Sequence, residues 1–282
     1  MGDARLKVQW EAVAAGAVMG SLFTSIMARF AKRRVAPTRI EWVSNPKTGW
    51  KPGDGAEFSE KQVPMRRLLP TEVPGGSCYP LVISSYVPRP IALVSTISSQ
   101  GVVNLAPFSY SGAMGHDPPL IAFSVCRKPG GLRKDTLANI EETKECVIHI
   151  MSEWFVEAAN HTCGNFPSEE DEFKLSGLTP VPSTLVAPPR CAESGVHFEC
   201  KVRELHDQAN AAGKVTTTIV VAEVVCFHIR EDLYDDNNGK GPTQVKPEDL
   251  RPMSRLGGDT YSTTTYVYDL PRPDRPKGGR RV

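Results

Sequence analysis

The stretch PRPIALVSTISSQGVVNLAPFSYSGAMGHDPPLIAFSV (88–125) carries the strongest signal for the fold. Within it, IALVSTI (91–97) is apolar and β-branched, and SSQG (98–101) is typical of a hairpin turn before VVNL (102–105). LIAFSV (120–125) is a candidate buried strand, since two prolines interrupt the chain just before it. The stretch therefore predicts a β-hairpin followed by a further strand.

More strands are predicted downstream. CVIHI (146–150) is a short apolar run, and residues 196–203 alternate apolar and polar side chains, as in a strand with one buried face. TTTIVVAEVVCFHI (216–229) predicts a long strand with a bulge around Glu223. TTTYVY (263–268) predicts the last strand of the set. Short strands separated by turn residues thus dominate this part of the chain.

Helices are few in the same pattern. Asp135 or Thr136 can cap a helix over LANIEET (137–143), and EWFVEAANHT (153–162) predicts a second helix. Many short strands with a few connecting helices favour a mainly β fold, a closed or split barrel, over a parallel α/β sheet. The sequence contains neither GxGxxG after a strand nor GxxxxGKS/T, which argues against a Rossmann or P-loop nucleotide site.

Composition excludes several classes of protein. The chain has 282 residues, with 33 Lys plus Arg against 32 Asp plus Glu, so no basic excess indicates a nucleic-acid binder. With 40% hydrophobic and 23% charged residues it can form a core, which argues against global disorder. Its 7 cysteines include no CxxC pair, so neither a disulfide framework nor a zinc site is predicted. Reduced thiols favour an intracellular, cytoplasmic location.

The ends of the chain differ from its middle. We expect an N-terminal segment (1–50), a folded domain (51–270) and a disordered basic tail (271–282). Residues 12–28 are apolar or small and are followed by basic residues. This stretch can be a helix or arm of a soluble protein, a mitochondrial presequence or a weak membrane anchor. Membrane contact is expected only through it.

Three segments carry polar features that a fold alone does not require. They are PRPIALVST (88–96), NLAPFSYSGAMGHDPP (104–119) and KDT (134–136), the last at a predicted helix N-terminus. A helix N-terminus attracts anions, so Lys134 and the Thr136 hydroxyl would complete a phosphate site. The hydroxyls of Ser95 and Thr96 could donate to the same anion, while residues 104–109 meet the edge of a planar ring. Together the segments suit a phosphorylated planar ligand.

Each segment also has an ordinary structural explanation. KDT can be a simple helix cap, and Arg89 can be an ion-pair partner at a surface or interface. His116 can be a loop residue that bonds to Asp117, or a proton donor at the ligand edge. NLAPFS can be a strand end followed by a turn. The order and spacing of the segments, not any one of them, favour the ligand site.

No metal site and no catalytic side chain are predicted. The six histidines are scattered, and no pair has the i, i+4 spacing of a helical metal site. His149, His197 and His228 fall in strand patterns and are expected to be sheet residues. A GxSxG nucleophile elbow is also missing from the sequence.

The ordered motifs resemble the flavin reductase-like family of FMN-binding split-barrel proteins, and within it the flavoredoxin-like branch. They are YPLVISSYVPRPIALVST (79–96), NLAPFSY (104–110), DPPLIAFSV (117–125), KDTLANIEETKECVIHI (134–150) and, later, SRLGGDTY (254–261). The resemblance implies a six-stranded Greek-key split barrel with a few connecting helices. It also implies bound FMN and a homodimer with the flavin near the subunit interface.

The same resemblance assigns roles to residues of this chain. It places the FMN-binding contacts at Arg89, Ser95, Thr96, Asn104, Leu105, Ala106, Pro107, Phe108, Ser109, Lys134, Asp135 and Thr136. It places the substrate or flavin edge at His116, Arg255 and Tyr261. The chain departs from the family pattern at Cys146, His149 and Gly195, where the family often has an aromatic residue, an asparagine and a proline.

The function implied is an FMN-dependent oxidoreductase. NADH or NADPH would give hydride to FMN, and reduced FMN would pass electrons to a small-molecule or flavin acceptor. Because the flavin supplies the reactivity, no side-chain general base is required. Two alternatives remain open, a non-catalytic FMN-binding or electron-carrier module and a split-barrel interaction protein without flavin.

Overall fold

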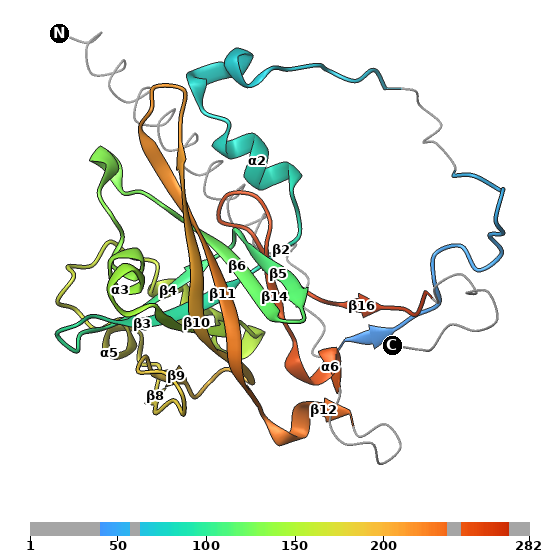
Figure 1. The fold of residues 1–282 in the computed structure, drawn as a ribbon. Helices are drawn as coiled ribbons and strands as arrows, with labels where there is room; N and C mark the ends of the chain where they lie inside the picture. The colour runs from blue at the N-terminus through green and yellow to red at the C-terminus, as the bar shows by residue number, and fades with distance from the viewer. Residues whose placement is uncertain (1–39, 57–62, 236–243, 271–282) are drawn as a thin grey trace, which may run out of the picture. The chain divides into compact units, whose positions relative to one another are not determined.

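A seven-stranded antiparallel sheet forms the centre of the computed structural model, in the order β4-β3-β7-β10-β11-β6-β5 (Figure 1). The structure describes residues 40–56, 63–235 and 244–270, all of them in one compact unit of the chain. The strands are β3 (Ala92–Ile97), β4 (Val103–Phe108), β5 (Ser111–His116), β6 (Pro119–Cys126), β7 (Glu145–Ile150), β10 (Val196–Ala209) and β11 (Val215–Ile229).

The sheet closes into a barrel through one bent run of chain. β4 lies at one edge of the sheet and β5 at the other, yet only two residues separate them in sequence. At this bend the backbone N–H of Ser124 donates to the carbonyl of Tyr110 at 2.9 Å, which ties the bend to β6. The predicted mainly β split barrel is therefore confirmed. The sheet has seven strands where six were expected, because the 103–116 run breaks in two at the bend.

The predicted β3–β4 hairpin is present. Ala92 pairs with Phe108 and Ile97 pairs with Val103 across the antiparallel ladder. Gly101 has a φ of 83°, a left-handed conformation that glycine adopts without strain, and its N–H donates to the carbonyl of Ser98 at 3.0 Å. The turn chemistry that the sequence indicated thus sets the register of this hairpin.

β10 and β11 form the longest hairpin, of 14 and 15 residues, whose turn end extends past the other strands in Figure 1. Glu199 pairs with Cys226 and Cys200 pairs with Val224, so Val225 is an extra residue on β11. The predicted bulge therefore exists, two residues beyond Glu223.

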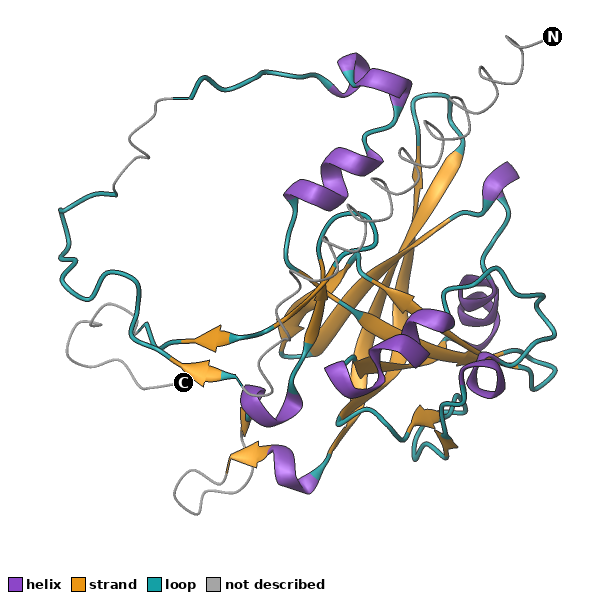
Figure 2. Ribbon diagram, turned by 180° about the vertical axis from the view of Figure 1, so that it is seen from behind, coloured by secondary structure: helices purple, strands orange, loops and turns teal. Residues whose placement is uncertain are grey.

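Two clusters of apolar side chains form the core. The first fills the barrel with side chains from its strands, among them Phe108, Phe123 and Ile148, and is closed by helix α3 (Asp135–Thr143) through Leu137 and Ile140. The second lies on the other face of β3 and β4, beneath the short helices α4 (Val156–His161) and α5 (Glu172–Ser176). Figure 2 shows short helices packed over the strands on this side.

Two predicted elements differ from the structure. The helix expected over 153–162 is a 3-10 turn, η4 (Glu153–Phe155), followed by α4, because the backbone of Phe155 is not helical (φ −134°, ψ 17°). The strand expected over 263–268 is divided between β15 (Tyr261–Thr263) and β16 (Tyr266–Val267), which pair with different partners outside the main sheet.

The prediction that one face of residues 196–203 is exposed to solvent is partly wrong. His197 and Glu199 are buried, although they occupy the polar positions of the alternating pattern. The chain segment that contains β8 (Pro180–Val181) and β9 (Arg190–Cys191) covers this face, since the backbone of Thr184 hydrogen-bonds to Glu199 and the guanidinium of Arg190 contacts His197.

Smaller elements flank the barrel. β1 (Glu41–Trp42) pairs in parallel with β16, and β14 (Met253–Arg255) joins β15 to β2 (Arg89–Pro90). The remaining elements are η1 (Pro70–Glu72), η2 (Pro74–Gly76), α2 (Tyr79–Ser85), η3 (Pro129–Gly131), η5 (Glu231–Leu233), β12 (Tyr234–Asp235), β13 (Gln244–Val245) and α6 (Pro247–Leu250).

The predictions for the two ends of the chain remain open. Residues 12–28 and the tail 271–282 lie outside the described residues, so the prediction of an anchor, a presequence or a disordered tail stays a prediction. In the part of the chain that the structure describes, no helix has the length and apolar character needed to span a membrane.

Candidate functional site

Four of the predicted site residues meet at one cleft. A cavity of about 130 Å³ is lined by Ile91, Pro107, Ser109, Cys163, Arg255 and Tyr261, and we call it the Pro107 cleft. Pro107 lies on β4 and Ser109 follows it, whereas Arg255 and Tyr261 are a cross-strand pair of β14 and β15. The fold thus brings the NLAPFS and RLGGDTY motifs together, although about 150 residues separate them.

The β14–β15 side of the cleft presents a cation on an aromatic ring. The Arg255 guanidinium carbon lies 4.4 Å from the centroid of the Tyr261 ring, a cation–π arrangement. The guanidinium also donates to the carbonyl of Gly258 at 2.5 Å, and the Tyr261 hydroxyl donates to Oδ1 of Asn160 at 2.6 Å. Both side chains are therefore held in place, which gives the cleft one positive, aromatic wall.

The side chains on the two faces of β4 pack into different apolar clusters. Phe108 is buried in the barrel core, and Ala106 packs against the same cluster. Leu105 is buried in the second cluster, and its N–H donates to Oε2 of Glu172 at 3.0 Å. Pro107 and Ser109 alone of the NLAPFS motif line the cleft. The roles of Leu105, Ala106 and Phe108 at a ring stay predictions, and their side chains serve the core.

The predicted hydroxyl donors form a buried network. Nδ2 of Asn104 donates to the Thr136 hydroxyl at 2.9 Å and lies 3.4 Å from the Thr96 hydroxyl, which also accepts from Nδ2 of Asn139 at 3.0 Å. The Ser95 hydroxyl donates to the carbonyl of Pro189 at 2.5 Å. All five side chains are buried. The contacts of Asn104, Thr96, Thr136 and Asn139 join β3 and β4 to α3, and that of Ser95 joins β3 to Pro189. The roles of Ser95, Thr96, Asn104 and Thr136 at a cofactor stay predictions.

Lys134 is exposed at the N-terminus of α3, next to Arg133, which is paired with Glu141. Lys134 is the N-cap residue of α3, and its Nζ lies 5.9 Å from the centroid of the Phe108 ring. Its neighbour Asp135 is held by Lys128 at 3.1 Å. The helix dipole places partial positive charge at this end, next to the Lys134 ammonium. Of the three KDT side chains, that of Lys134 is exposed, and the role of the motif at a phosphate stays a prediction.

Arg89 is a structural clamp in this fold. It is 2% exposed, and its guanidinium donates to the carbonyls of Ile83, Tyr86 and Leu256. Its Nε also lies 3.5 Å from the Ser109 hydroxyl. Arg89 thus ties α2 and the loop after β14 to the strand beside the Pro107 cleft, and it supports the cleft from behind.

His116 lies apart from the cleft. It is exposed at the end of β5, where it pairs with Pro119. Its role at the substrate edge stays a prediction, since it does not line the Pro107 cleft.

Sequence reasoning missed three residues near the cleft. Ile91 and Cys163 line it, and Glu172 fixes the backbone of β4 behind it. Burial raises the pKa of the Glu172 carboxyl, against the opposing effect of the hydrogen bond from Leu105. Ile91 sits inside a quoted motif and could have been named from it. Cys163 lies in the turn after α4 and Glu172 on α5, and no local pattern reveals that they come to lie near β4.

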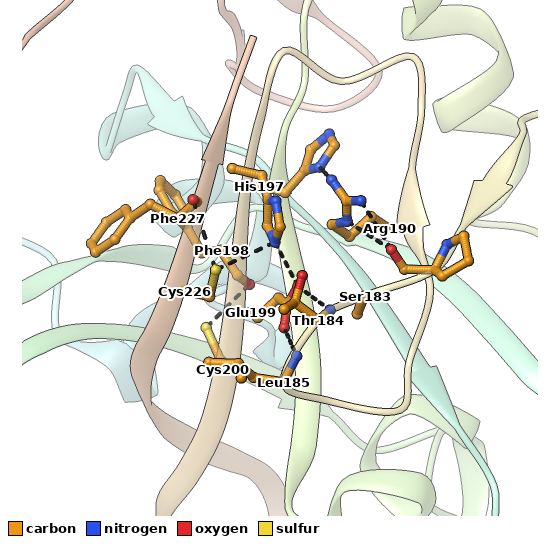
Figure 3. Close-up of polar contacts among 12 residues, drawn as sticks. Ser183, Thr184, Leu185, Arg190, His197, Phe198, Glu199, Cys200, Cys226 and Phe227 are labelled. Atoms are coloured by element: carbon orange, nitrogen blue, oxygen red, sulfur yellow. Dashed lines mark hydrogen bonds and ion pairs between the residues drawn. The ribbon is translucent and has the colours of Figure 1, made fainter. Parts of the chain in front are cut away.

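A second polar cluster lies on β10 and β11, away from the predicted motifs. The Glu199 carboxylate, the Cys226 thiol and the His228 ring place their ligand atoms within 4.8 Å of one another. The sequence predicted no metal-ligating set, because the histidines are scattered. Cross-strand pairing nevertheless brings this carboxylate, thiol and imidazole together. Figure 3 shows Glu199 and Cys226 on the two facing strands.

Histidines 149 and 197 are sheet residues, as predicted. The His149 ring is buried; Nδ1 lies 2.8 Å from the carbonyl of Leu93, and Nε2 accepts from the N–H of Cys191 at 2.9 Å. These partners assign a neutral ring with the proton on Nδ1. Burial, helped by nearby His197, lowers the pKa of His149 to about 3. Burial likewise lowers the pKa of His197 to about 4.

A larger apolar cavity shares Ile91 with the Pro107 cleft and is otherwise lined by different residues. Its volume is about 360 Å³, and its walls include Pro90, Gly112, Ile148, Phe198 and Phe227. Phe227 is 53% exposed, and its ring packs edge-on against Phe198 with centroids 5.5 Å apart. An exposed apolar surface of this kind is typical of a contact site.

Known proteins share this fold and sequence. The family model for the flavin reductase like domain matches residues 84–243 of this chain. An uncharacterised protein of Halalkalibacterium halodurans is 39% identical over 207 residues, which cover 73% of this chain and 96% of that protein.

Solved structures of similar proteins have the same fold as this chain. Nitrilotriacetate monooxygenase component B from Bacillus cereus superposes with a TM-score of 0.69 at 35% identity, covering 74% of this chain and 100% of that chain. The 2-nitrobenzoate 2-nitroreductase of Pseudomonas fluorescens gives a TM-score of 0.62 at 30% identity, covering 77% of this chain and 99% of that chain. The barrel, the ordered motifs and these matches lead to one conclusion: the chain belongs to the flavin reductase-like domain family.

Proposed function

We propose that this protein is an FMN-binding oxidoreductase that takes hydride from NADH or NADPH and passes electrons to a small-molecule or flavin acceptor. The observation that carries the proposal is the Pro107 cleft, where residues of two separate family motifs meet and the half-buried Arg255 lies over the Tyr261 ring. Family membership supports a flavin cofactor. Two structural neighbours at 30% identity or more are, by name, a monooxygenase component and a nitroreductase, both redox proteins.

The residues at the cleft fit a flavin in charge and shape. Pro107 and Ile91 offer apolar surface to a planar ring, and the Ser109 hydroxyl can bond to its polar edge. Arg255, held over Tyr261, supplies positive charge where a reduced ring gains electron density. Flavin, when bound, accepts hydride from a reduced nicotinamide and donates electrons onward.

The size of the cleft bears on how a flavin would sit. At about 130 Å³ it is smaller than the roughly 300–1,000 Å³ of most ligand pockets. We therefore infer that one face or edge of the ring extends out of the cleft. That face would be open to nicotinamide, to the acceptor or to a second subunit, and ring stacking at close range would supply much of the rate.

The phosphate of FMN is assigned to Lys134. Its ammonium is exposed at the positive end of α3, whereas Ser95, Thr96 and Thr136 donate or accept within the protein. Asp135 is occupied by Lys128. A charge-assisted hydrogen bond to an anion is worth about 1.5–3 kcal/mol.

Calorimetric titration of the full chain with FMN tests the proposal. Lys134→Ala should weaken FMN binding by roughly 10- to 150-fold, the equivalent of about 1.5–3 kcal/mol, and should change riboflavin binding less. Lys174→Ala is the matched control, since Lys174 is exposed on α5 and its replacement removes the same charge. Equal FMN affinity in the Lys134 and Lys174 variants would show that the phosphate lies elsewhere. No FMN binding by the wild-type chain would refute the function itself.

A homodimer is part of the same proposal. The apolar cavity beside Phe198 and Phe227, with Met114 63% exposed on the neighbouring strand β5, supplies surface that a second copy would cover. Sedimentation velocity of the purified chain should show a dimer at micromolar concentration. A monomer throughout that range, with or without FMN, would remove the dimer from the proposal.

A further inference from the structure

The side chains of Glu199, Cys226 and His228 share one face of the β10–β11 hairpin. Glu199 is the cross-strand partner of Cys226, and His228 lies two residues further along β11, so the three point to the same side. Nε2 of His228 lies 2.6 Å from Oε1 of Glu199 and 3.4 Å from Sγ of Cys226. All three ligand atoms fall within 4.8 Å of one another. None of these residues lines the Pro107 cleft.

The carboxylate is held rigidly in this position. Glu199 is fully buried, and its two oxygens accept from the backbone N–H groups of Thr184 at 2.7 Å and Leu185 at 2.6 Å. Figure 3 shows these two residues beside the carboxylate, with Cys226 on the facing strand. Backbone donors of this kind orient a carboxylate without neutralising it, as outer-shell partners do in metal sites.

The buried charge of Glu199 has no lysine or arginine partner among the ion pairs of the described residues. Its one side-chain partner there is the imidazole of His228. The nearby Arg190 is directed elsewhere: its guanidinium donates to the carbonyl of Pro182 and lies 3.5 Å from Nδ1 of His197. An ionised carboxylate offers about four acceptor sites, and Glu199 fills three of them with two backbone N–H groups and the His228 ring, so a cation can bind at the remaining one.

We propose that Glu199, Cys226 and His228 form a binding site for a thiophilic divalent metal ion of the Zn²⁺ class, with water as a fourth ligand. Thiolate, imidazole and carboxylate are the ligands that Zn²⁺ takes, at about 2.0–2.3 Å. Tetrahedral geometry with such bonds separates ligand atoms by roughly 3.3–3.8 Å. The Sγ to Nε2 distance of 3.4 Å already fits, and the shorter Nε2 to Oε1 contact opens as the metal replaces the proton between them.

Solvent can reach the site. His228 lines an open cavity of about 450 Å³ together with Arg190, His197, Arg230 and Tyr234. Through His228 the site borders this cavity, which gives the ion a route from solvent. Binding releases the thiol proton of Cys226 to solvent. The single proton of the neutral His228 ring moves from Nε2 to Nδ1 by exchange with solvent, so that Nε2 binds the metal and no second proton is lost. The metal then links β10, β11 and the segment at 183–185.

Cobalt(II) titration of the metal-free full chain tests the proposal, because a Co²⁺–thiolate bond gives a charge-transfer absorption band. Wild-type protein should develop the band with one ion per chain, and Zn²⁺ should displace it. Cys226→Ser should abolish the band, and His228→Gln should weaken Co²⁺ binding about 10-fold or more. Cys126→Ser is the matched control: Cys126 is an exposed thiol on β6, and its loss should leave the band unchanged.

Thermal unfolding supplies a second readout that does not depend on the thiolate band. Added Zn²⁺ should raise the Tm of the wild-type chain and of Cys126→Ser, but not that of Cys226→Ser, because an ion bound only by the native state stabilises it. Absence of a thiolate band in wild-type protein, or an equal band in Cys226→Ser, would overturn the proposal. Loss of the band in Cys126→Ser would place the metal elsewhere and overturn it as well.

Discussion

Acidification should destabilise this protein through His149. The ring is fully buried on β7, with Nδ1 on the carbonyl of Leu93 and Nε2 accepting from Cys191. Protonation would place a second hydrogen on Nε2, facing the N–H of Cys191, and would charge a ring that is fully buried. The native pKa is therefore lowered to about 3, whereas an unfolded histidine titrates near 6.5.

The difference between the two pKa values gives the sign and the size of the change in the free energy of unfolding with pH. Between the two pKa values the unfolded chain binds a proton that the native state excludes, so stability falls as the pH falls through 6.5. About pH 5 is about 1.5 units below the pKa of the unfolded ring. This residue alone therefore lowers the free energy of unfolding by about 2 kcal/mol at that pH. His197, whose pKa is lowered to about 4 and which is less completely enclosed, adds a loss of the same sign.

Urea unfolding at about pH 7 and pH 5 measures the effect. His149→Gln keeps one donor and one acceptor but does not titrate, so its acid-induced loss should be about 2 kcal/mol smaller than that of the wild type. His206→Gln, at an exposed histidine of β10, is the control and should behave like the wild type. Equal losses in wild type and His149→Gln would refute the reasoning, as would an NMR titration of the His149 ring near pH 6.5.

Two further substitutions test how the barrel supports the cleft. Asn104→Ala removes the donor that bonds to Thr136 and should lower the free energy of unfolding by about 1–3 kcal/mol in urea; an unchanged value would mean that the network between β4 and α3 adds no stability. Arg89→Lys keeps the charge but cannot reach the carbonyls of Ile83 and Leu256 together, so it should destabilise the fold and weaken FMN binding; full stability and affinity would show that the clamp is dispensable.

Local patterns in the sequence were sufficient for most strands of the barrel, but not for β5 or for the run at 263–268. The β3–β4 hairpin followed from an apolar run and a glycine turn, and both are local properties of residues 91–105. The assignment of faces was less reliable. Glu199 occupies a polar position of an alternating strand, yet the segment that contains Thr184 and Leu185 covers it. Alternation reports two faces and does not reveal what later parts of the chain pack against each one.

The candidate site was predictable only in part, because local motifs name its residues but not the way in which distant parts of the chain pack around them. Pro107 and Arg255 could be named from motifs, and the structure brings them to one cleft. The inward direction of the Thr96 hydroxyl depends on Asn139, which reaches it only when α3 packs on the barrel. The Glu199–Cys226 pairing depends on the register of a long hairpin with a bulge, and no spacing in the sequence encodes it.

The most direct test of the central claim is an anaerobic absorbance spectrum of the FMN-loaded full chain before and after addition of NADH or NADPH. An FMN oxidoreductase should bind the flavin, lose its visible band on mixing with one of the two nicotinamides, and regain the band when an acceptor is added. Bound flavin that neither nicotinamide bleaches would instead favour a non-catalytic electron carrier. A chain that binds no FMN at all would contradict the account.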